Sequence, residues 1–349
     1  MLSADKRVAV AMSGGVDSAV AAALLLAQGW QVQGLTMRLW REDDVDPAPA
    51  EAAIVCQQLG IAHQVVDLRE AFFEQVVEPF VRDYAAGRTP NPCLRCNHAL
   101  KFGVLLESAL ALGAHYLATG HYARTRQVDG AWRLLSAADA RKDQSYVLYA
   151  LGQAQLAHLL FPLGDLSKEQ VRAEAARLGL AAAERAESQD ICFLRDNDYR
   201  RYLAERVPEA VRPGPILDVQ GRTLGQHKGL PFYTVGQREG LGLAAPRPLY
   251  VMRLDAQRNA LVVGYDEELG RRELTAAEVS WVSGGAPAQG APVEAKVRYR
   301  ARRTAAYVWP LPGARIRVTL AEPLRDITPG QGVVLYQGEV VLGGGIIEE

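Results

Sequence analysis

The chain lacks the features that mark membrane-spanning, secreted and disordered proteins. No apolar run in its 349 residues approaches the roughly 20 residues of a membrane helix, and residues 1–7 lack the apolar segment of a secretory signal. Four cysteines are too few for a disulfide framework in a chain of this size. With 49% apolar, 23% charged and only 7% aromatic residues, the composition is that of a soluble globular protein. We expect a cytoplasmic protein without membrane contact, whose thiols react or bind metal.

The chain also lacks a strong net charge. The formal net charge of −1 excludes a protein that binds nucleic acid through overall basicity. Residues 296–303 are a local exception, with five basic residues and no acid. Every second residue from Lys296 to Arg302 is basic, so a strand would project these charges to one side. Such a row suits an RNA phosphate backbone, although a solvated strand face has the same pattern.

No fixed-period repeat and no low-complexity tract divides the chain, which is long enough for two or three domains. Strand-like and helix-like segments alternate up to about residue 200, which predicts a parallel sheet covered by helices. Residues 274–347 hold about six short strands with turn signals between them. We predict an α/β + β fold: an N-terminal parallel-sheet domain (1–200), a small central domain (201–270) and a C-terminal β-barrel (271–349).

Five shorter segments carry specific expectations. Residues 70–86 and 99–112 have the apolar spacing of helices, whereas residues 87–97 are rich in helix breakers and predict a loop. Residues 144–160 predict mainly helix. Residues 127–136 predict a hairpin that turns at Asp129 and Gly130.

The stretch Val8–Ser18 joins an apolar strand to an alanine-rich helix through two glycines. A helix N-terminus has unpaired N–H groups, and glycine lets a phosphate approach the main chain. The Lys-Ser/Thr pair of a Walker A loop is missing, which argues against ordinary γ-phosphoryl transfer. Asp17 can hold Mg²⁺, and Ser13 and Ser18 can donate hydroxyls. A plain glycine turn is the alternative, but Ser-Gly-Gly-Val-Asp-Ser resembles the PP-loop of ATP pyrophosphatases, which adenylate a substrate oxygen and release pyrophosphate.

Two cysteine motifs extend the resemblance to most of the chain. They are Thr89–Asn97, with Cys93 and Cys96, and Glu187–Phe193, with Cys192. Together with the PP-loop they resemble the bacterial tRNA-specific 2-thiouridylases, which thiolate the wobble uridine of certain tRNAs. The other stretches that fit this family are Thr36–Arg38, Thr119–Tyr122, Arg141–Ser145, Gly225–Gly229, Tyr233–Gln237, Val297–Arg300 and Pro329–Gln331. The resemblance implies activation of the C2 oxygen by ATP, because a carbonyl oxygen is a poor leaving group until it departs within AMP.

The resemblance also implies roles for individual residues. Cys96 would be the nucleophile, and Cys192 would carry the sulfur as a persulfide. Asn91, Pro92 and Cys93 would border the target base, which is flipped out to reach both an α-phosphate and a thiol. The residues that bind ATP would be Ala11, Met12, Ser13, Gly14, Gly15, Val16, Asp17, Ser18, Met37 and Gly120. The residues that contact tRNA would be His121, Lys142, Asp143, Gln144, Arg298, Tyr299 and Gln331.

Cys93 departs from the commonest family pattern, which has Asp at this position. Cys93, Cys96 and Cys192 can together hold a 4Fe–4S cluster with one open iron. A zinc site needs another Cys or His, for which His98 is the nearby candidate. The persulfide relay itself needs no metal. Besides ATP and Mg²⁺, the resemblance implies tRNA as substrate and a cysteine desulfurase or a sulfur-relay protein as sulfur donor.

Two other functions stay open at this stage. An ATP pyrophosphatase acting on a small molecule, such as an amide-forming synthetase, would leave the thiols and the basic segment unused. A tRNA-binding or metal-sensing module would bind RNA without releasing AMP. Cys56 lies among apolar residues at helical spacing, and we assign it to packing only. Cys192 taken alone also fits core packing, and only the resemblance makes it catalytic.

Overall fold

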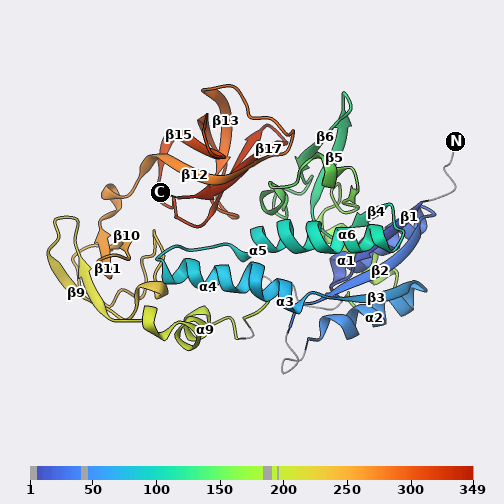
Figure 1. Ribbon diagram of the computed structural model, residues 1–349, viewed down its shortest axis with the longest axis horizontal. Helices are drawn as coiled ribbons and strands as arrows, with labels where there is room; N and C mark the ends of the chain where they lie inside the picture. The colour runs from blue at the N-terminus through green and yellow to red at the C-terminus, as the bar shows by residue number, and fades with distance from the viewer. Residues whose placement is uncertain (1–5, 41–45, 184–190, 195, 349) are drawn as a thin grey trace.

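The computed structural model describes residues 6–40, 46–183, 191–194 and 196–348, so residues 187–190 of the second cysteine motif lie outside the described residues. Figure 1 shows three parts: an α/β domain at the right, a β-barrel above the middle and a small sheet at the left. The long helices of the α/β domain run below the barrel toward the small sheet. The predicted α/β + β fold class is confirmed.

The N-terminal domain contains a five-stranded parallel sheet in the order β3-β2-β1-β4-β7. Its strands are β1 (Arg7–Ala11), β2 (Gln31–Arg38), β3 (Ala62–Asp67), β4 (Tyr116–Ala118) and β7 (Leu159–Leu160). The helices packed on or beside it include α1 (Val16–Ala27), α2 (Ala48–Leu59) and α8 (Lys168–Arg177). The strand order reverses at β1, so the carboxyl end of β1 is the topological switch point where such sheets bind ligands.

Each of two long helices contains a π-helical stretch. The first comprises α3 (Arg69–Phe72), η1 (Phe73–Val77) and α4 (Glu78–Ala85), as predicted. The second comprises α5 (Pro92–Arg95), η2 (Cys96–Val104) and α6 (Leu105–Ala111). The predicted loop 87–97 is therefore wrong from Pro92 onward. Pro92 occupies the first helical position, where its missing N–H costs nothing, and Asn91 caps the helix by accepting from the Cys93 N–H at 3.1 Å.

The predicted helix over residues 144–160 is mostly wrong. This segment contains the 3₁₀ helix η3 (Ser145–Leu148), the single turn α7 (Gln153–Leu156) and strand β7. The Asp143 carboxylate accepts from the N–H of Ser145 at 3.1 Å and from its hydroxyl at 2.9 Å, which gives the backbone an alternative to a regular helix. Tyr146, Leu148 and Leu151 are all buried in one core, so their apolar spacing does not report a helical face.

Six antiparallel strands close the C-terminal barrel in the order β12-β15-β14-β13-β16-β17, with β17 returning to β12. They are β12 (Arg271–Trp281), β13 (Ala291–Lys296), β14 (Thr304–Leu311), β15 (Arg315–Leu324), β16 (Gly332–Gln337) and β17 (Val340–Ile347). The hairpin of β5 (Ala123–Val128) and β6 (Ala131–Ser136) turns at Asp129 and Gly130, as predicted. Because β6 pairs with β17, one hydrogen-bonded sheet joins the first domain to the barrel.

The predicted basic strand over residues 296–303 is wrong. Strand β13 ends at Lys296, and residues 297–303 form the turn toward β14. The basic side chains of this turn have separate partners: Arg298 donates to the Val235 carbonyl at 2.8 Å, and the Arg303 guanidinium lies 3.7 Å from the centre of the Tyr336 ring. Carbonyl oxygens and aromatic faces both attract cations, so an alternating basic pattern does not require a strand.

The central part is a four-stranded sheet in the order β10-β11-β8-β9. Its strands are β8 (Gly214–Leu217), β9 (Thr223–His227), β10 (Tyr250–Asp255) and β11 (Ala260–Gly264). The helices near it are α9 (Tyr199–Arg206), η4 (Pro208–Ala210), η5 (Leu230–Phe232) and η6 (Asp266–Glu268). Ile216, Val251 and Leu261 are buried in an apolar cluster confined to this part of the chain.

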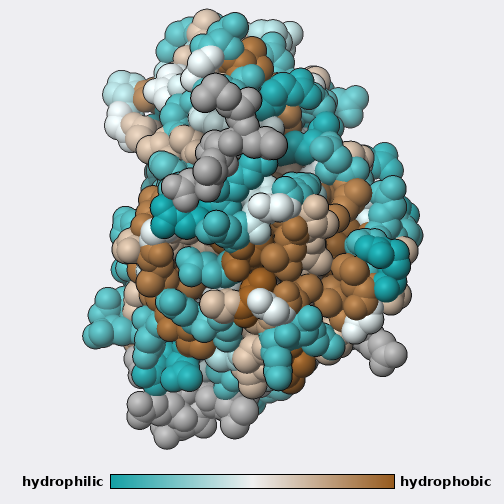
Figure 2. All heavy atoms as spheres, turned by 90° about the vertical axis from the view of Figure 1, so that its right-hand side faces the viewer, coloured by the Kyte–Doolittle hydropathy of each residue, from teal (hydrophilic) through white to brown (hydrophobic). Residues whose placement is uncertain are grey.

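Apolar side chains gather on the face of the molecule in Figure 2, which is the right-hand end in Figure 1 and lies away from the carboxyl ends of the sheet strands. The large apolar side chains that are exposed on the N-terminal domain include Ile54 of α2 and Val65 of β3. Within the described residues we find no helix with the length and apolar character of a membrane span. The candidate site lies elsewhere, at the switch point of the sheet.

Candidate active site

The phosphate loop occupies residues 12–15, between β1 and α1. Gly14 has a φ of 76°, a conformation that residues with a Cβ seldom adopt. The Ser18 hydroxyl ties the loop to the helix: it donates to the Gly15 carbonyl at 3.0 Å and accepts from the Ser13 N–H at 3.3 Å. The predicted order of strand, loop and helix is confirmed.

Gly120, two residues after β4, is a second position that requires glycine. A Cβ at Gly120 would lie 2.7 Å from the carbonyl carbon of Asp17 and 2.8 Å from the nitrogen of Ser18. A pocket of about 190 Å³ opens at this junction. The residues that line it are Ala11, Met12, Ser13, Asp17, Ser18, Leu35, Met37, Lys101, Leu105, Thr119, Gly120, His121 and Gln144. All but Gly14, Gly15 and Val16 of the residues predicted to bind ATP therefore line one pocket.

Asp17, the predicted magnesium ligand, lies in an ion pair. The ammonium group of Lys168 is 2.7 Å and 2.9 Å from its two carboxylate oxygens, and the Tyr122 hydroxyl donates to Oδ1 at 2.7 Å. Lys168 is the first residue of α8, and its side chain is buried. Carboxylate oxygens suit Mg²⁺, but here a protein cation already neutralises them. Magnesium binding at Asp17 requires Lys168 to change partner.

Two residues predicted to contact tRNA line this pocket. His121 is buried, and its Nδ1 is 2.8 Å from the Thr119 hydroxyl. Burial lowers the pKa of His121 well below its usual value, and the charge on Lys101 lowers it further, so the imidazole is neutral near pH 7. The Gln144 side chain accepts from the Tyr122 N–H at 2.9 Å, which fixes it beside the pocket.

Cys93 and Cys96 lie on the helix of α5 and η2. The buried side chains of Leu94, Leu100 and Phe102 hold this helix against the protein. Cys96 is half-buried and packs against an apolar cluster that includes Leu100 and the helix residues Phe72 and Phe80. The Asn97 side chain donates to the Val147 carbonyl at 3.2 Å. The two thiols therefore occupy a fixed helix rather than a loop.

The residues next to Cys192 reach the same apolar cluster from a distant part of the sequence. The Phe193 ring is 5.1 Å from the ring of Phe80 and 5.8 Å from that of Phe72, centre to centre. Leu194 is buried in the cluster as well. Cys192 itself stays exposed, so its neighbours provide the packing and leave the thiol accessible.

The three thiols are at least partly accessible to solvent, and they lie close enough together for their charges to interact. Desolvation raises the pKa of Cys93, of Cys96, and of Cys192, the last to about 12. Negative charge on Cys96 and Cys93 contributes to the raised pKa of Cys192, whereas the Lys101 ammonium lowers the pKa of all three thiols. We call these three cysteines the thiol recess. Its thiols are protonated near neutral pH and must lose a proton before they attack.

The described part of the chain offers no metal centre: it contains no group of three or more His, Cys, Asp or Glu side chains placed to hold a metal ion. The thiol recess in this arrangement therefore fits neither the 4Fe–4S cluster nor the zinc site considered from the sequence.

The remaining residues predicted to contact tRNA form contacts within the protein. Asp143 is buried, and Arg298 bonds to the barrel and the central part. The Gln331 side chain donates to the Thr89 carbonyl at 2.7 Å. Lys142 is half-buried, and Tyr299 is 36% exposed. These residues lie where the domains meet, and their contact with tRNA stays a prediction.

Two lysines of the pocket region are not among the residues predicted from the sequence. Lys168 stands at the start of a helix, where the helix dipole disfavours a cation, and this mismatch is a signal that sequence reasoning can use. Lys101 gives no such signal. It follows Cys96 by five positions, a spacing that α-helical periodicity places on another face, and the π-helix that changes this is not evident from the sequence.

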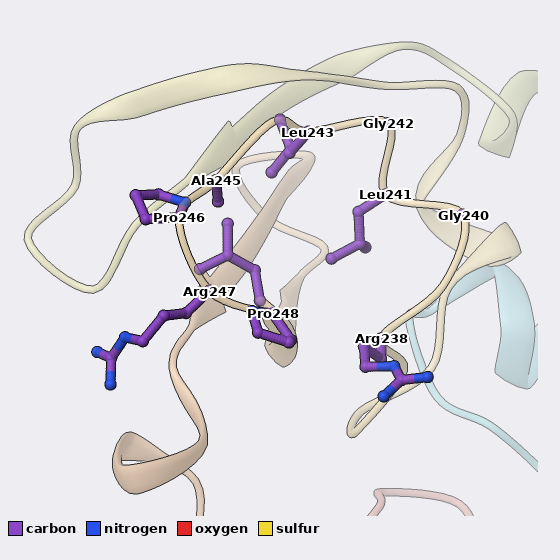
Figure 3. A pocket seen from close by; sticks show the side chains of 10 residues that line it. Arg238, Gly240, Leu241, Gly242, Leu243, Ala245, Pro246, Arg247 and Pro248 are labelled. Carbon is purple, nitrogen blue, oxygen red and sulfur yellow. The ribbon is translucent and has the colours of Figure 1, made fainter.

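A larger cavity, of about 400 Å³, lies in the central part between Arg238 and Leu249. Figure 3 shows Leu241 and Leu243 pointing into the loop that surrounds it, while Arg247 points outward. Arg247 lies 4.2 Å from the centre of the Tyr265 ring and pairs with Glu267 at 2.8 Å. The lining residues include no acid, histidine or thiol, so this cavity lacks the groups for the predicted chemistry.

Comparisons with known proteins give matches along the whole chain. Three family models match: a tRNA methyl transferase HUP domain over residues 6–196, a tRNA methyl transferase PRC-barrel domain over 200–265 and an aminomethyltransferase beta-barrel domain over 271–347. A solved U34-tRNA thiolase, NcsA from Methanococcus maripaludis, is 18% identical, with a TM-score of 0.35 over 58% of this chain and 64% of that chain.

Relatives match far more closely along the whole chain. The tRNA-specific 2-thiouridylase MnmA of Moorella thermoacetica is 51% identical over 97% of this chain and 98% of that protein. The protein of the same name from Symbiobacterium thermophilum is 48% identical over 98% of this chain and 92% of that protein. The descriptions of two family models mention methyl transfer, but these relatives are named for thiolation. The chain belongs to the family of the tRNA-specific 2-thiouridylases.

Proposed function

We propose that this protein is an ATP-dependent tRNA-uridine 2-sulfurtransferase, which replaces the C2 oxygen of the wobble uridine by sulfur. One observation carries the proposal: a single helix joins the nucleotide pocket to a thiol. Helix η2 begins at Cys96 and contributes Lys101 to the pocket wall. It continues directly into α6, which contributes Leu105. The site can thus activate a base with ATP and attack it with sulfur without moving the base far.

The first step is adenylation of the base. The C2 oxygen of uracil bonds to the α-phosphorus of ATP, the bond from that phosphorus to the bridging oxygen breaks, and pyrophosphate leaves with the electron pair. The N3 proton of uracil passes to solvent. Ala11, Met12, Ser13, Gly14, Gly15, Val16, Asp17, Ser18, Met37 and Gly120 form or shape the ATP site in this proposal. Mg²⁺ bound with ATP would neutralise phosphate charge, with Asp17 as its protein ligand.

The second step transfers sulfur. A persulfide on Cys192 attacks C2 with its outer sulfur, and AMP leaves with the C–O electron pair. Cys96 then attacks the Cys192 sulfur, which releases the outer sulfur to the base and leaves a Cys96–Cys192 disulfide. The two thiols supply the two electrons that reduce the transferred sulfur, and an external thiol reductant restores them. A cysteine desulfurase or a sulfur-relay protein reloads Cys192.

We assign catalysis to residues 1–200, a linking role to residues 201–270 and tRNA contact to residues 271–349. Asn91, Pro92 and Cys93 would border the flipped base beside Cys96. The tRNA would lie against the domain junction near Lys142 and Tyr299. We expect the enzyme to work in the cytoplasm, where unmodified tRNA is available.

The decisive experiment follows ³⁵S from cysteine into unmodified tRNA, with a desulfurase, Mg-ATP and anaerobically purified protein. We expect labelled tRNA and AMP from the wild type, and no label from Cys96→Ala or Cys192→Ala. Cys56→Ala is the control, because this thiol is buried in α2, away from the recess. Wild-type protein that releases AMP with a small molecule but never labels tRNA would favour an amide-forming synthetase, and RNA binding without AMP would indicate a binding module.

A further inference from the structure

Lys101 is a half-buried lysine in the wall of the nucleotide pocket, close to Ser13 and Ser18 of the phosphate loop and its helix. Among the described residues it forms no hydrogen bond and no ion pair. The other lysine at this site, Lys168, is paired with Asp17. A partly desolvated ammonium group without an anion is unfavourable, and an anionic ligand relieves this cost.

The π-helical geometry places Lys101 and Cys96 on the same face of the helix. In a π-helix each N–H bonds to the carbonyl five residues earlier, so residues five apart lie nearly one above the other. Lys101 follows Cys96 by five residues within η2. The charge on Lys101 also acts on the pKa of Cys96, of Cys192 and of His121, as expected for a cation between the thiol recess and the pocket. Lys101 therefore stands where the two halves of the site meet.

We propose that Lys101 binds the α-phosphate of ATP and then the same phosphate in the adenylated uridine. This inference rests on the proposed adenylation. The phosphate loop would hold the outer phosphates, so the α-phosphate is the one nearest the thiols. Negative charge gathers on its oxygens while the C2 oxygen attacks and pyrophosphate leaves, and again when AMP departs. A preorganised ammonium at that point stabilises both transition states.

Binding of AMP and of adenosine to the intact protein tests the contact without tRNA or sulfur, because the two ligands differ only in the α-phosphate. Calorimetric titration of Lys101→Met should show AMP affinity reduced about 10-fold or more, the usual worth of a charged hydrogen bond, with adenosine affinity unchanged. Lys101→Arg should keep most of the AMP affinity. Lys6→Met is the matched control. Lys6 precedes β1, so it lies at the amino end of that strand while the pocket lies at the carboxyl end, and its ammonium group is over the Trp30 ring.

A second measurement follows the reaction itself. In single turnover with unmodified tRNA, Lys101→Met should release pyrophosphate about 100-fold more slowly than wild type, with unchanged tRNA binding. Equal loss of AMP and adenosine affinity would overturn the contact, as would normal pyrophosphate release with failure only at sulfur transfer. If the wild type releases no pyrophosphate with tRNA, the proposed function fails, while the AMP titration still reports on Lys101.

Discussion

The nucleotide pocket and the thiol recess share one helix but are built in opposite ways. The phosphate loop is a short continuous stretch whose shape is set by backbone, with Gly14 at positive φ and Gly120 packed against its helix. The thiol recess joins Cys96 to Cys192 from remote parts of the chain through a shared apolar cluster. The pocket presents polar groups already held in place, whereas the recess keeps its thiols protonated by desolvation.

This difference separates binding from chemistry. A preformed polar pocket can bind ATP at once, because its groups need little rearrangement. Protonated thiols are poor nucleophiles and resist stray oxidation, so these thiols stay unreactive until they lose a proton. Lys101 lies between the two, with its charge acting on the thiols while its side chain lines the pocket. If this division is right, substitutions in one half should leave the other half unchanged.

Among these substitutions, Gly120→Ala should have the largest effect on activity, because it disrupts the nucleotide pocket. The new Cβ would meet backbone atoms of Asp17 and Ser18 at under 3 Å, so the phosphate loop must shift. We expect kcat/KM for ATP to fall about 100-fold, because a shift of the phosphate loop misaligns the reacting groups. Gly285→Ala is the control, since a Cβ there meets nothing within 4 Å. The rates at which iodoacetamide alkylates Cys96 and Cys192 should not change, and a parallel change would mean that the halves are not independent.

Lys168→Met should reduce stability as well as ATP use. It removes two short contacts to the Asp17 carboxylate and leaves the Tyr122 hydroxyl as a donor to Oδ1. We expect the free energy of unfolding to fall by about 2 kcal/mol, a moderate value because the Asp17 side chain is 34% exposed. Urea denaturation of Lys168→Met, Asp17→Asn and the double variant measures the coupling. Additive losses would show that the ion pair does not stabilise the loop.

Much of the fold follows from the sequence because the signals are local. Residues 8–18 form the predicted strand, loop and helix start, and the hairpin turns at Asp129 and Gly130 as predicted. The errors arise where tertiary contacts decide. Pro92 indicates a loop until its place at the first helical position is known. The alternation from Lys296 to Arg302 indicates a strand until β13 is seen to end at Lys296 and Arg298 is seen to bond to the Val235 carbonyl.

The candidate site also has one part that the sequence predicts and another part that it does not. The contiguous pattern from Ser13 to Ser18 predicts the phosphate loop, because strand, glycines and helix are adjacent in sequence. Neither the pairing of Lys168 with Asp17 nor the place of Lys101 follows from spacing, since both depend on how separate elements pack. The gathering of Cys192 with Cys96 came from the family resemblance, and its packing through Phe193 became visible only in the fold.

The pH dependence of stability caused by His121 tests whether desolvation also sets the protonation of a side chain in the nucleotide pocket. Its folded pKa lies below the unfolded value, so the folded protein binds fewer protons than the unfolded chain at acidic pH. The stability contributed by neutral His121 is present above about pH 6.5 and is lost as pH falls, by up to about 1.4 kcal/mol per pH unit. Urea denaturation from pH 7.5 to 5.5 should therefore show the wild type and His121→Gln converging as pH falls. Parallel curves would contradict a buried neutral imidazole.

Cys93→Asp should have the smallest effect and sharpens the role of the recess. In the two-thiol relay Cys93 does not carry sulfur, so ³⁵S transfer should stay within about three-fold of wild type. A small loss is expected, because a carboxylate disfavours the thiolate of Cys96 nearby, and Lys101 offsets part of this. Cys96→Ser is the matched comparison and should abolish transfer. If Cys93→Asp also abolishes transfer, and the anaerobic wild type contains iron that the variant lacks, then the recess rearranges around a metal and the two-thiol relay is wrong.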